Sequence, residues 1–161
     1  MGYALRKKIT KKKWPLTILY DDREKNPWVL KSMYFKMKRQ RLITGDYTID
    51  GYTSRVAVEK KSGLHELVQN ISGIDRKRFK STLERLSKFE HKYFVIDGTL
   101  DDIDLVLKKL PSKTRIDKVS VCHWLTLISV KYGIPVIFLG NKNSTRKLIL
   151  EKLFVHIANE L

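Results

Sequence analysis

The chain has 161 residues, which is enough for one domain with a buried core. Its 33 lysines and arginines outnumber 17 aspartates and glutamates, so the formal net charge is +16. This excess favours a polyanionic partner, and nucleic acid, acidic lipid and a ribosomal partner all fit it. No apolar run is long enough to span a bilayer, and the N-terminus lacks the apolar stretch of a secretory signal. We therefore expect a cytoplasmic protein that is not secreted and not membrane-bound.

The N-terminal residues 1–13 contain six lysines or arginines and no acid. We predict that residues 1–15 form a basic, partly disordered arm that gains order on nucleic acid, with a solubilising tail as the alternative. Residues 16–161 then form one folded domain. The single cysteine, Cys122, excludes an internal disulfide and suits a reducing compartment. Its place beside His123 in an apolar helical pattern predicts a buried structural thiol.

The first predicted element is an apolar strand at residues 15–20, which ends in the sequence DDRE at residues 21–24. Acidic residues at the end of a strand stand where the chain leaves the sheet, a common position for catalytic groups. The spacing of apolar residues between Trp28 and Gln40 then predicts a helix with a basic polar face.

Residues 43–61 read as two extended runs joined by a polar turn. A loop centred between residues 52 and 53 places Asp46 opposite Glu59, whereas a tight turn at residues 50–51 would pair Asp46 with Arg55. Two facing carboxylates are unfavourable unless a cation lies between them. Oxygen ligands favour Mg²⁺, and Lys61 adds a positive charge beside it, an arrangement that suits phosphodiester hydrolysis. A hairpin whose charged side chains simply face solvent is the alternative.

The remaining pattern alternates helices and strands. Helices are predicted at residues 63–71, 76–89, 100–110, 115–132 and from residue 143 or 144 to 160, with strands at residues 92–96 and 134–139. The helix at 76–89 is the most basic segment outside the N-terminal arm, with a polar face of Arg76, Lys77, Arg78, Lys80, Arg85 and Lys88. Interleaved strands and helices predict a layered α/β domain with a central mixed β-sheet flanked by helices.

With these motifs in hand, residues 16–161 resemble the nuclease domain of XPF-type structure-specific endonucleases, within the PD-(D/E)XK, restriction-endonuclease-like superfamily. The resemblance is carried by DDRE at residues 21–24, GDY at 45–47 and VEKKS at 58–62. The segments ELVQNI and YFVIDG follow in the order found in the family. Two departures stand out: Lys60 replaces the family's central arginine, and His65 occupies the position of a later acid, with Glu66 next to it.

The resemblance implies a restriction-endonuclease-like core and a set of site residues. By resemblance, Asp21, Asp46 and Glu59 would bind Mg²⁺ or Mn²⁺, with Glu24 joining in or holding a water, and Lys61 would serve the attacking water or the developing charge. By the same resemblance, Arg23 and Lys60 would steady the scissile phosphate or the site itself. The basic residues Arg76, Lys77, Arg78 and Lys80 would bind DNA, and a homodimer is an option.

The leading hypothesis is therefore a metal-dependent DNA endonuclease, with fork, flap or branched DNA as candidate substrates and a role in DNA repair or recombination implied. The alternative is a catalytically inactive DNA-binding or scaffold protein that retains the fold. The joint presence of Asp21, Asp46, Glu59 and Lys61 favours the enzyme. An RNA-binding domain is a third option, but the sequence lacks an aromatic-rich stacking signature.

Overall fold

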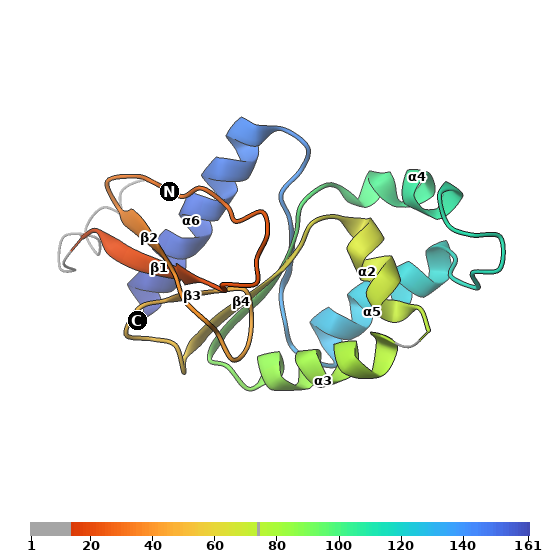
Figure 1. Ribbon diagram of the computed structural model, residues 1–161, viewed down its shortest axis with the longest axis horizontal. Coiled ribbons are helices and arrows are strands. Elements are labelled where there is room, and N and C mark those ends of the chain that lie inside the picture. The colour runs from red at the N-terminus through yellow and green to blue at the C-terminus, as the bar shows by residue number, and fades with distance from the viewer. Residues whose placement is uncertain (1–13, 74) are drawn as a thin grey trace.

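The computed structural model describes residues 14–73 and 75–161, so most of the predicted basic arm lies outside the described residues. The described part is built on a six-stranded sheet with the strand order β2-β1-β3-β4-β5-β6 (Figure 1). The strands are β1 (Leu16–Tyr20), β2 (Phe35–Arg39), β3 (Tyr47–Ile49), β4 (Val56–Lys61), β5 (His91–Ile96) and β6 (Val136–Phe138). The sheet is mixed: β3 runs antiparallel to β1 and β4, whereas the pairs β1–β2, β4–β5 and β5–β6 are parallel.

Helices cover both faces of this sheet. They are α2 (Leu64–Ile71), α3 (Asp75–Ser87), α4 (Ile103–Lys108), α5 (Lys118–Val130) and α6 (Asn143–Glu160), with a 3₁₀ turn η1 (Leu100–Asp102) before α4. Helix α6 lies apart from the other helices, on the opposite side of the sheet from α2, α3 and α5 (Figure 1). The predicted α/β class, with a central mixed sheet flanked by helices, is confirmed. None of the described helices is long and apolar enough to cross a membrane.

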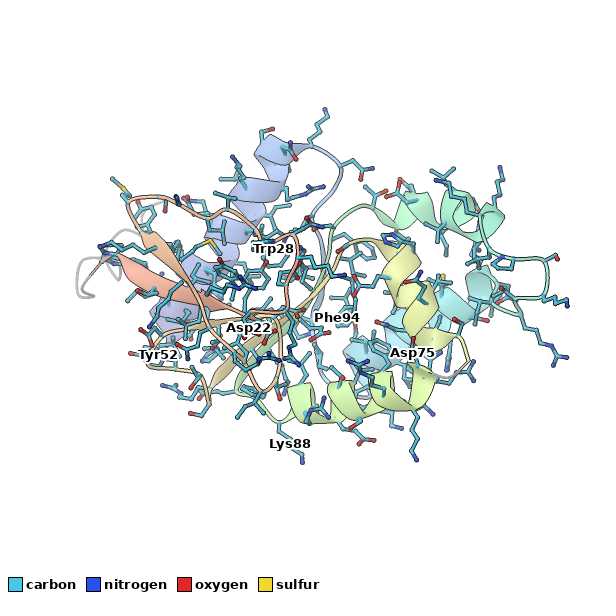
Figure 2. The ribbon with its side chains drawn as sticks, viewed as in Figure 1. Asp22, Trp28, Tyr52, Asp75, Lys88 and Phe94 are labelled. Atoms are coloured by element: carbon cyan, nitrogen blue, oxygen red, sulfur yellow. The ribbon has the colours of Figure 1, made fainter. Side chains whose placement is uncertain are left out.

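Strand β4 is the centre of the fold because both of its faces are buried. Val56 and Val58 pack in a hydrophobic cluster that contains α6, and Ala57 packs in a second cluster with α2, α3 and α5. The side chains of this strand therefore alternate between the two faces of the sheet. Figure 2 shows Trp28, which belongs to the first cluster, and Phe94, which belongs to the second.

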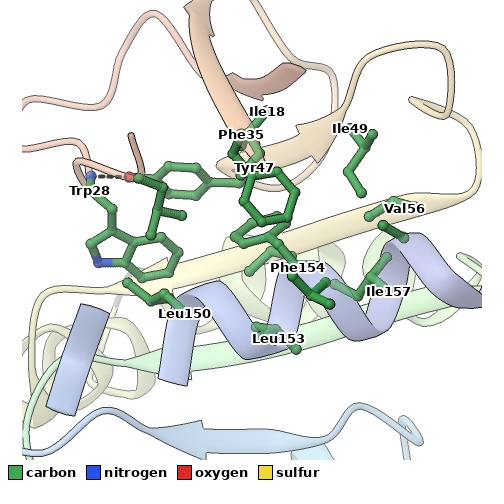
Figure 3. Packing of buried hydrophobic residues seen from close by; sticks show 14 of the residues in the cluster. Ile18, Trp28, Phe35, Tyr47, Ile49, Val56, Leu150, Leu153, Phe154 and Ile157 are labelled. Atoms are coloured by element: carbon green, nitrogen blue, oxygen red, sulfur yellow. Dashed lines mark hydrogen bonds between the residues drawn. The ribbon is translucent and has the colours of Figure 1, made fainter. Parts of the chain in front are cut away.

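The first cluster joins the β1–β3 half of the sheet to α6 (Figure 3). The rings of Trp28 and Tyr47 stack with centroids 4.3 Å apart. The hydroxyl of Tyr47 accepts a hydrogen bond of 2.8 Å from the backbone N–H of Trp28, which satisfies a polar group inside the core (Figure 3). These contacts hold the irregular segment after β1 against the sheet, directly beside the ends of β1 and β4.

The predicted helix between Trp28 and Gln40 is wrong. Residues 28–34 are irregular, and residues 35–39 form β2. The sequence FKMKR of β2 alternates apolar and charged residues, so Phe35 is buried while Lys36 and Lys38 are exposed, as a half-buried strand requires. Its parallel pairing with β1, where Leu16 lies beside Phe35, supplies the backbone hydrogen bonds that a helix would otherwise supply.

The prediction of a buried thiol is also wrong, because Cys122 is exposed. The buried stripe of α5 consists of Val121, Trp124 and Ile128, and Cys122 follows Val121 by one residue. One residue turns the helix by about 100°, which moves Cys122 away from this stripe.

Candidate active site

A cleft of about 430 Å³ opens where β1, β3 and β4 meet α3. The cleft brings together segments that are far apart in the sequence. The ionisable residues that line it are Asp21, Arg23, Glu24, Lys25, Asp46, Glu59, Lys60, Lys61, Glu66, Arg78 and Arg85. All five predicted catalytic residues are among them.

The β3–β4 hairpin places two acids at the floor of this cleft. Tyr47 pairs with Val58, so the predicted longer loop is confirmed. The same register, extended by one residue, places Asp46 opposite Glu59. Two hydrogen bonds fix this register beyond the strand: Asp46 N–H donates to the Val58 carbonyl at 2.8 Å, and Lys60 N–H donates to Asp46 Oδ2 at 2.7 Å.

The charge on Asp46 is strongly disfavoured. Burial and, after it, the negative charge of Glu59 raise the pKa of Asp46 from 3.8 to about 8, although the Lys60 N–H and the Lys61 ammonium act in the opposite direction. At neutral pH this carboxyl group holds its proton unless another positive charge replaces it. A cation bound at this carboxyl group would displace the proton and would be stabilised by the negative charge that remains.

Lys61 is a buried cation beside the two acids. Its Nζ lies 2.9 Å from Glu59 Oε1 and 3.4 Å from Glu66 Oε1, and it lies over the rings of Phe79 and Phe94. Burial opposes its charge, but the carboxylates of Glu59 and Glu66 outweigh burial and raise the pKa of Lys61. Lys61 is therefore a charged donor rather than a base at neutral pH.

Of the two residues considered for the acid after the VEKKS motif, Glu66 is the one that contacts the site. Its Oε1 faces Lys61, and its Oε2 accepts a hydrogen bond of 2.8 Å from the Ser62 N–H. His65 is exposed and does not line the cleft. Helix α2 begins after Gly63, whose φ of +159° is nearly extended, and its first turn carries Glu66 back over the end of β4.

Asp21 lines the cleft, but both of its carboxylate oxygens already accept hydrogen bonds from neighbouring residues. Arg23 N and Nε donate to Oδ1, at 2.9 and 2.6 Å, while Arg23 Nη2 and Leu42 N donate to Oδ2, at 2.9 and 2.8 Å. Arg23 is the main reason that the pKa of Asp21 falls to about 2. The carboxylate is 2% exposed and links the end of β1 to the loop before β3.

Lys60 and Glu24 also hold the site together. The Lys60 side chain is 3% exposed, and its ammonium group lies 3.3 Å from Glu24 Oε1, donates to the Asn26 carbonyl and lies over the Trp28 ring. Of the two roles predicted for Lys60, these contacts match support of the site itself. Glu24 Oε1 also accepts a hydrogen bond of 2.9 Å from Asn26 N–H.

Helix α3 presents only part of its predicted basic face to the cleft. Of the four basic residues predicted to bind DNA, Arg78 lines the cleft, as does Arg85 two turns further along the helix. Arg76 donates to the Ile71 carbonyl, Lys80 lies over the Trp124 ring, and Lys77 is exposed elsewhere on the helix.

The donor set fits a hard divalent cation only in part. Among residues 14–73 and 75–161, no three His, Cys, Asp or Glu side chains form a preformed metal cluster. The facing pair Asp46 and Glu59 supplies oxygen donors, and Mg²⁺ typically needs only one or two carboxylates besides water and substrate phosphate. The high pKa of Asp46 is consistent with a missing positive charge at this pair.

Two residues that line the cleft, Glu66 and Arg85, are not among the predicted site residues. Glu66 was left as one of two candidates, and the structure distinguishes it from His65 by its contact with Lys61. Arg85 belonged to the basic face but not to the predicted DNA-binding set. The helical spacing of Arg78 and Arg85, seven residues or two turns apart, was the signal that both share one face.

Comparison with known proteins agrees with this geometry. Residues 20–151 match the ERCC4 domain. A protein of Methanocaldococcus jannaschii, provisionally named an ATP-dependent RNA helicase, is 30% identical over 144 residues, which are 89% of this chain and 16% of that protein. The chain therefore spans about a sixth of the curated relative it matches.

Two solved structures share the fold. XPF from Aeropyrum pernix superposes with a TM-score of 0.63 at 18% identity, covering 88% of this chain and 64% of that one. The same protein in complex with DNA gives a TM-score of 0.62 at 17% identity, covering 90% of this chain and 66% of that one. The resemblance to XPF-type nuclease domains is confirmed.

Proposed function

The chain belongs to the ERCC4 domain family, and on this basis we propose that it is a metal-dependent DNA endonuclease. The observation that carries the proposal is the pair Asp46 and Glu59, which face each other beside the buried ammonium group of Lys61. A nuclease needs oxygen donors for a cation and a positive charge for the phosphate at one place, and these three side chains supply both.

Asp46 and Glu59 are the proposed holders of the cation, Mg²⁺ or Mn²⁺. When bound there, the cation would lower the pKa of a water and offset charge on the phosphate oxygens. The role of Asp21 as a third ligand stays a prediction, because its oxygens accept hydrogen bonds from Arg23 and Leu42. Glu24 lines the same cleft, where it could hold a water as predicted.

Lys61 is the proposed partner of the attacked phosphate. Because it keeps its proton, it would donate a hydrogen bond to the attacking water or to a phosphate oxygen as negative charge develops. Glu66 would act as a positioning residue, since it contacts the ammonium group and is itself fixed by the Ser62 N–H. Lys60 and Arg23 would keep the loops beside the site in place.

DNA is the proposed substrate. Arg78 and Arg85 line the cleft opposite the acids, and their guanidinium groups suit phosphates on either side of the scissile bond. The net charge of +16 would attract DNA from a distance. Arg76, Lys77 and Lys80 extend the positive field of α3 without lining the cleft. These properties suit action wherever cellular or viral DNA is held.

A homodimer remains part of the proposal. Helix α5 exposes the apolar side chains of Val119 and Val130 as well as the thiol of Cys122, and this face is the proposed contact between two copies. Sedimentation velocity at several concentrations measures the oligomeric state. Concentration-dependent dimerisation that weakens in Val130→Asp would support the dimer, and a monomer at every concentration would exclude it.

Cleavage of labelled DNA separates the enzyme from an inactive scaffold that retains the fold. Fork, flap, junction, single-stranded and duplex DNA are incubated with Mg²⁺, Mn²⁺ or EDTA, with the wild-type chain and with Asp46→Asn and Lys61→Ala. Metal-dependent cleavage that both substitutions abolish is the expected result. Tight binding without cleavage under every condition would favour the scaffold.

A further inference from the structure

The loop between β2 and β3 separates two cavities. One is the active-site cleft, and the other is a groove of about 490 Å³ lined by Gln40, Arg41, Leu42, Ile43, Thr44, Thr48, Thr53, Ser54 and Phe89. Ile43 and Thr44 line both. Residues that border two neighbouring cavities form the wall between them, so this loop is a ridge with one groove on each side.

Ile43 is the apolar crest of this ridge. Its side chain is 95% exposed, the highest value among the large exposed hydrophobic residues of the described chain. A single exposed apolar residue is common and by itself indicates nothing. Here, however, the residue lies at the lip of the cleft, three positions before Asp46.

The ridge is held from both sides. Before Ile43, the buried Leu42 donates to Asp21 Oδ2 at 2.8 Å and accepts from Arg23 Nη2 at 3.0 Å. After it, Gly45 adopts a φ of +76°, and a Cβ there would lie 3.2 Å from the Val58 carbonyl oxygen. The loop is thus pressed against β4 and tied to the end of β1, which leaves Ile43 fixed in solvent.

The two grooves differ in chemistry. The cleft contains the acids and most of the charge, whereas Arg41 is the only charged residue among those lining the second groove. That groove offers hydroxyl groups from Thr53 and Ser54 and the ring of Phe89. Hydroxyl and aromatic groups suit an unpaired strand, whose bases are free to stack and to form hydrogen bonds.

We propose that Ile43 is a wedge that parts two DNA strands, one lying in the active-site cleft and the other in the second groove. The proposal rests on the proposed nuclease function and adds a specificity determinant to it. An inserted aliphatic side chain unstacks neighbouring bases, and this costs least where pairing has already ended. The ridge therefore favours forks and flaps over continuous duplex.

Fluorescence of 2-aminopurine tests this wedge separately from cleavage. The probe base is placed at the last base pair before a fork, and binding is followed in Ca²⁺, so that no turnover is required. We expect binding of the wild-type chain to raise the fluorescence, and Ile43→Ser to lose most of the rise. In Mg²⁺ the ratio of fork to duplex cleavage should fall on the order of tenfold in Ile43→Ser.

Two variants serve as controls. Ile43→Met keeps an aliphatic wedge and should retain the signal. Met33→Ser removes another residue that is 76% exposed but lines neither groove, and it should behave as the wild type. Circular dichroism melting shows whether each variant is folded.

The outcomes separate the wedge from the nuclease. A normal fluorescence rise and an unchanged fork preference in Ile43→Ser would overturn the wedge and leave the nuclease intact. A rise that depends on Ile43 in a chain that never cleaves would support the wedge while the nuclease proposal fails. A chain that binds no DNA would overturn both.

Discussion

The backbone N–H of Lys60 donates a hydrogen bond of 2.7 Å to the carboxylate of Asp46, across the open end of the β3–β4 hairpin. This bond lies next to the pair Tyr47 and Val58, and together they hold Asp46 facing Glu59. The backbone therefore compensates part of the repulsion between the two acids. A cation bound between Asp46 and Glu59 would offset the remaining repulsion.

Substitution of Asp46 separates function from stability. Asp46→Asn should reduce cleavage by about 10²-fold or more, since it removes a proposed ligand and charge at the reacting centre. The same change should raise the thermal midpoint in EDTA at pH 8, because the amide oxygen can still accept from Lys60 N–H without repelling Glu59. Cleavage rates and differential scanning fluorimetry check the two effects. Loss of both activity and stability would contradict the assigned repulsion.

The metal-free protein should lose stability as the pH rises. The pKa of Asp46 is about 8 in the folded chain against 3.8 for the free side chain, so the folded state binds more protons between these values. The free energy of unfolding therefore falls from about pH 4 to pH 8. Melting in EDTA across this range measures the fall, and Asp46→Asn should flatten it. The low pKa of Asp21 acts only at the acidic end, where its contribution is lost as the pH drops towards about 2.

Lys61 should act through its charge and not as a base. Lys61→Met should reduce cleavage by about 10²-fold with little change in DNA affinity, because the ammonium group lies at the reacting centre. The wild-type pH–rate profile should show no loss from deprotonation of Lys61 at neutral or mildly alkaline pH, since its pKa is raised by Glu59 and Glu66. Glu66→Gln should cause a smaller loss, and Glu66→Asp should recover part of it. A variant Lys61→Met with normal turnover would remove Lys61 from the mechanism.

The carboxylate of Asp21 should matter for stability. Asp21→Asn replaces an acceptor of four hydrogen bonds from Arg23 and Leu42, and we expect a destabilisation of about 1–3 kcal/mol in urea unfolding. The partly exposed Arg23 contributes less than the buried Leu42 N–H. Cation affinity measured on the same variant tests the predicted third-ligand role: a loss comparable to that of Asp46→Asn would support it.

The salt dependence of DNA binding tests the cleft face of α3. Arg78→Ala and Arg85→Ala should each lower the slope of log affinity against log salt by about one, as expected for one lost phosphate contact. Lys131→Ala is the matched control, because Lys131 lies over Tyr132 at the end of α5 and does not line the cleft. Equal slopes in all three variants would place the DNA elsewhere.

The central hairpin could be predicted because its information is local. The turn chemistry between Asp50 and Ser54 and the alternation of β4 fix the register, and the register alone brings Asp46 to Glu59. The order of the later helices and strands also followed from apolar periodicity. Their ends shifted by a few residues, as at α5, which begins at Lys118 rather than Arg115.

Features that depend on distant partners could not be predicted. Residues 35–39 alternate apolar and charged side chains over only five positions, and their parallel partner β1, which supplies the backbone hydrogen bonds, is distant in the sequence. The oxygens of Asp21 accept hydrogen bonds from Arg23 and Leu42, and the contact with Leu42 forms only because the loop before β3 folds back onto the end of β1. The role of Glu66 rather than His65 likewise depends on where α2 starts.

The most direct measurement is calorimetric titration of Mn²⁺ into the wild-type chain at pH 7, repeated in buffers with different ionisation enthalpies. Because the pKa of Asp46 is about 8, the account predicts binding with release of close to one proton, and loss of both in Asp46→Asn. Absence of binding, or Asp46→Asn that binds Mn²⁺ as tightly as the wild type, would contradict it.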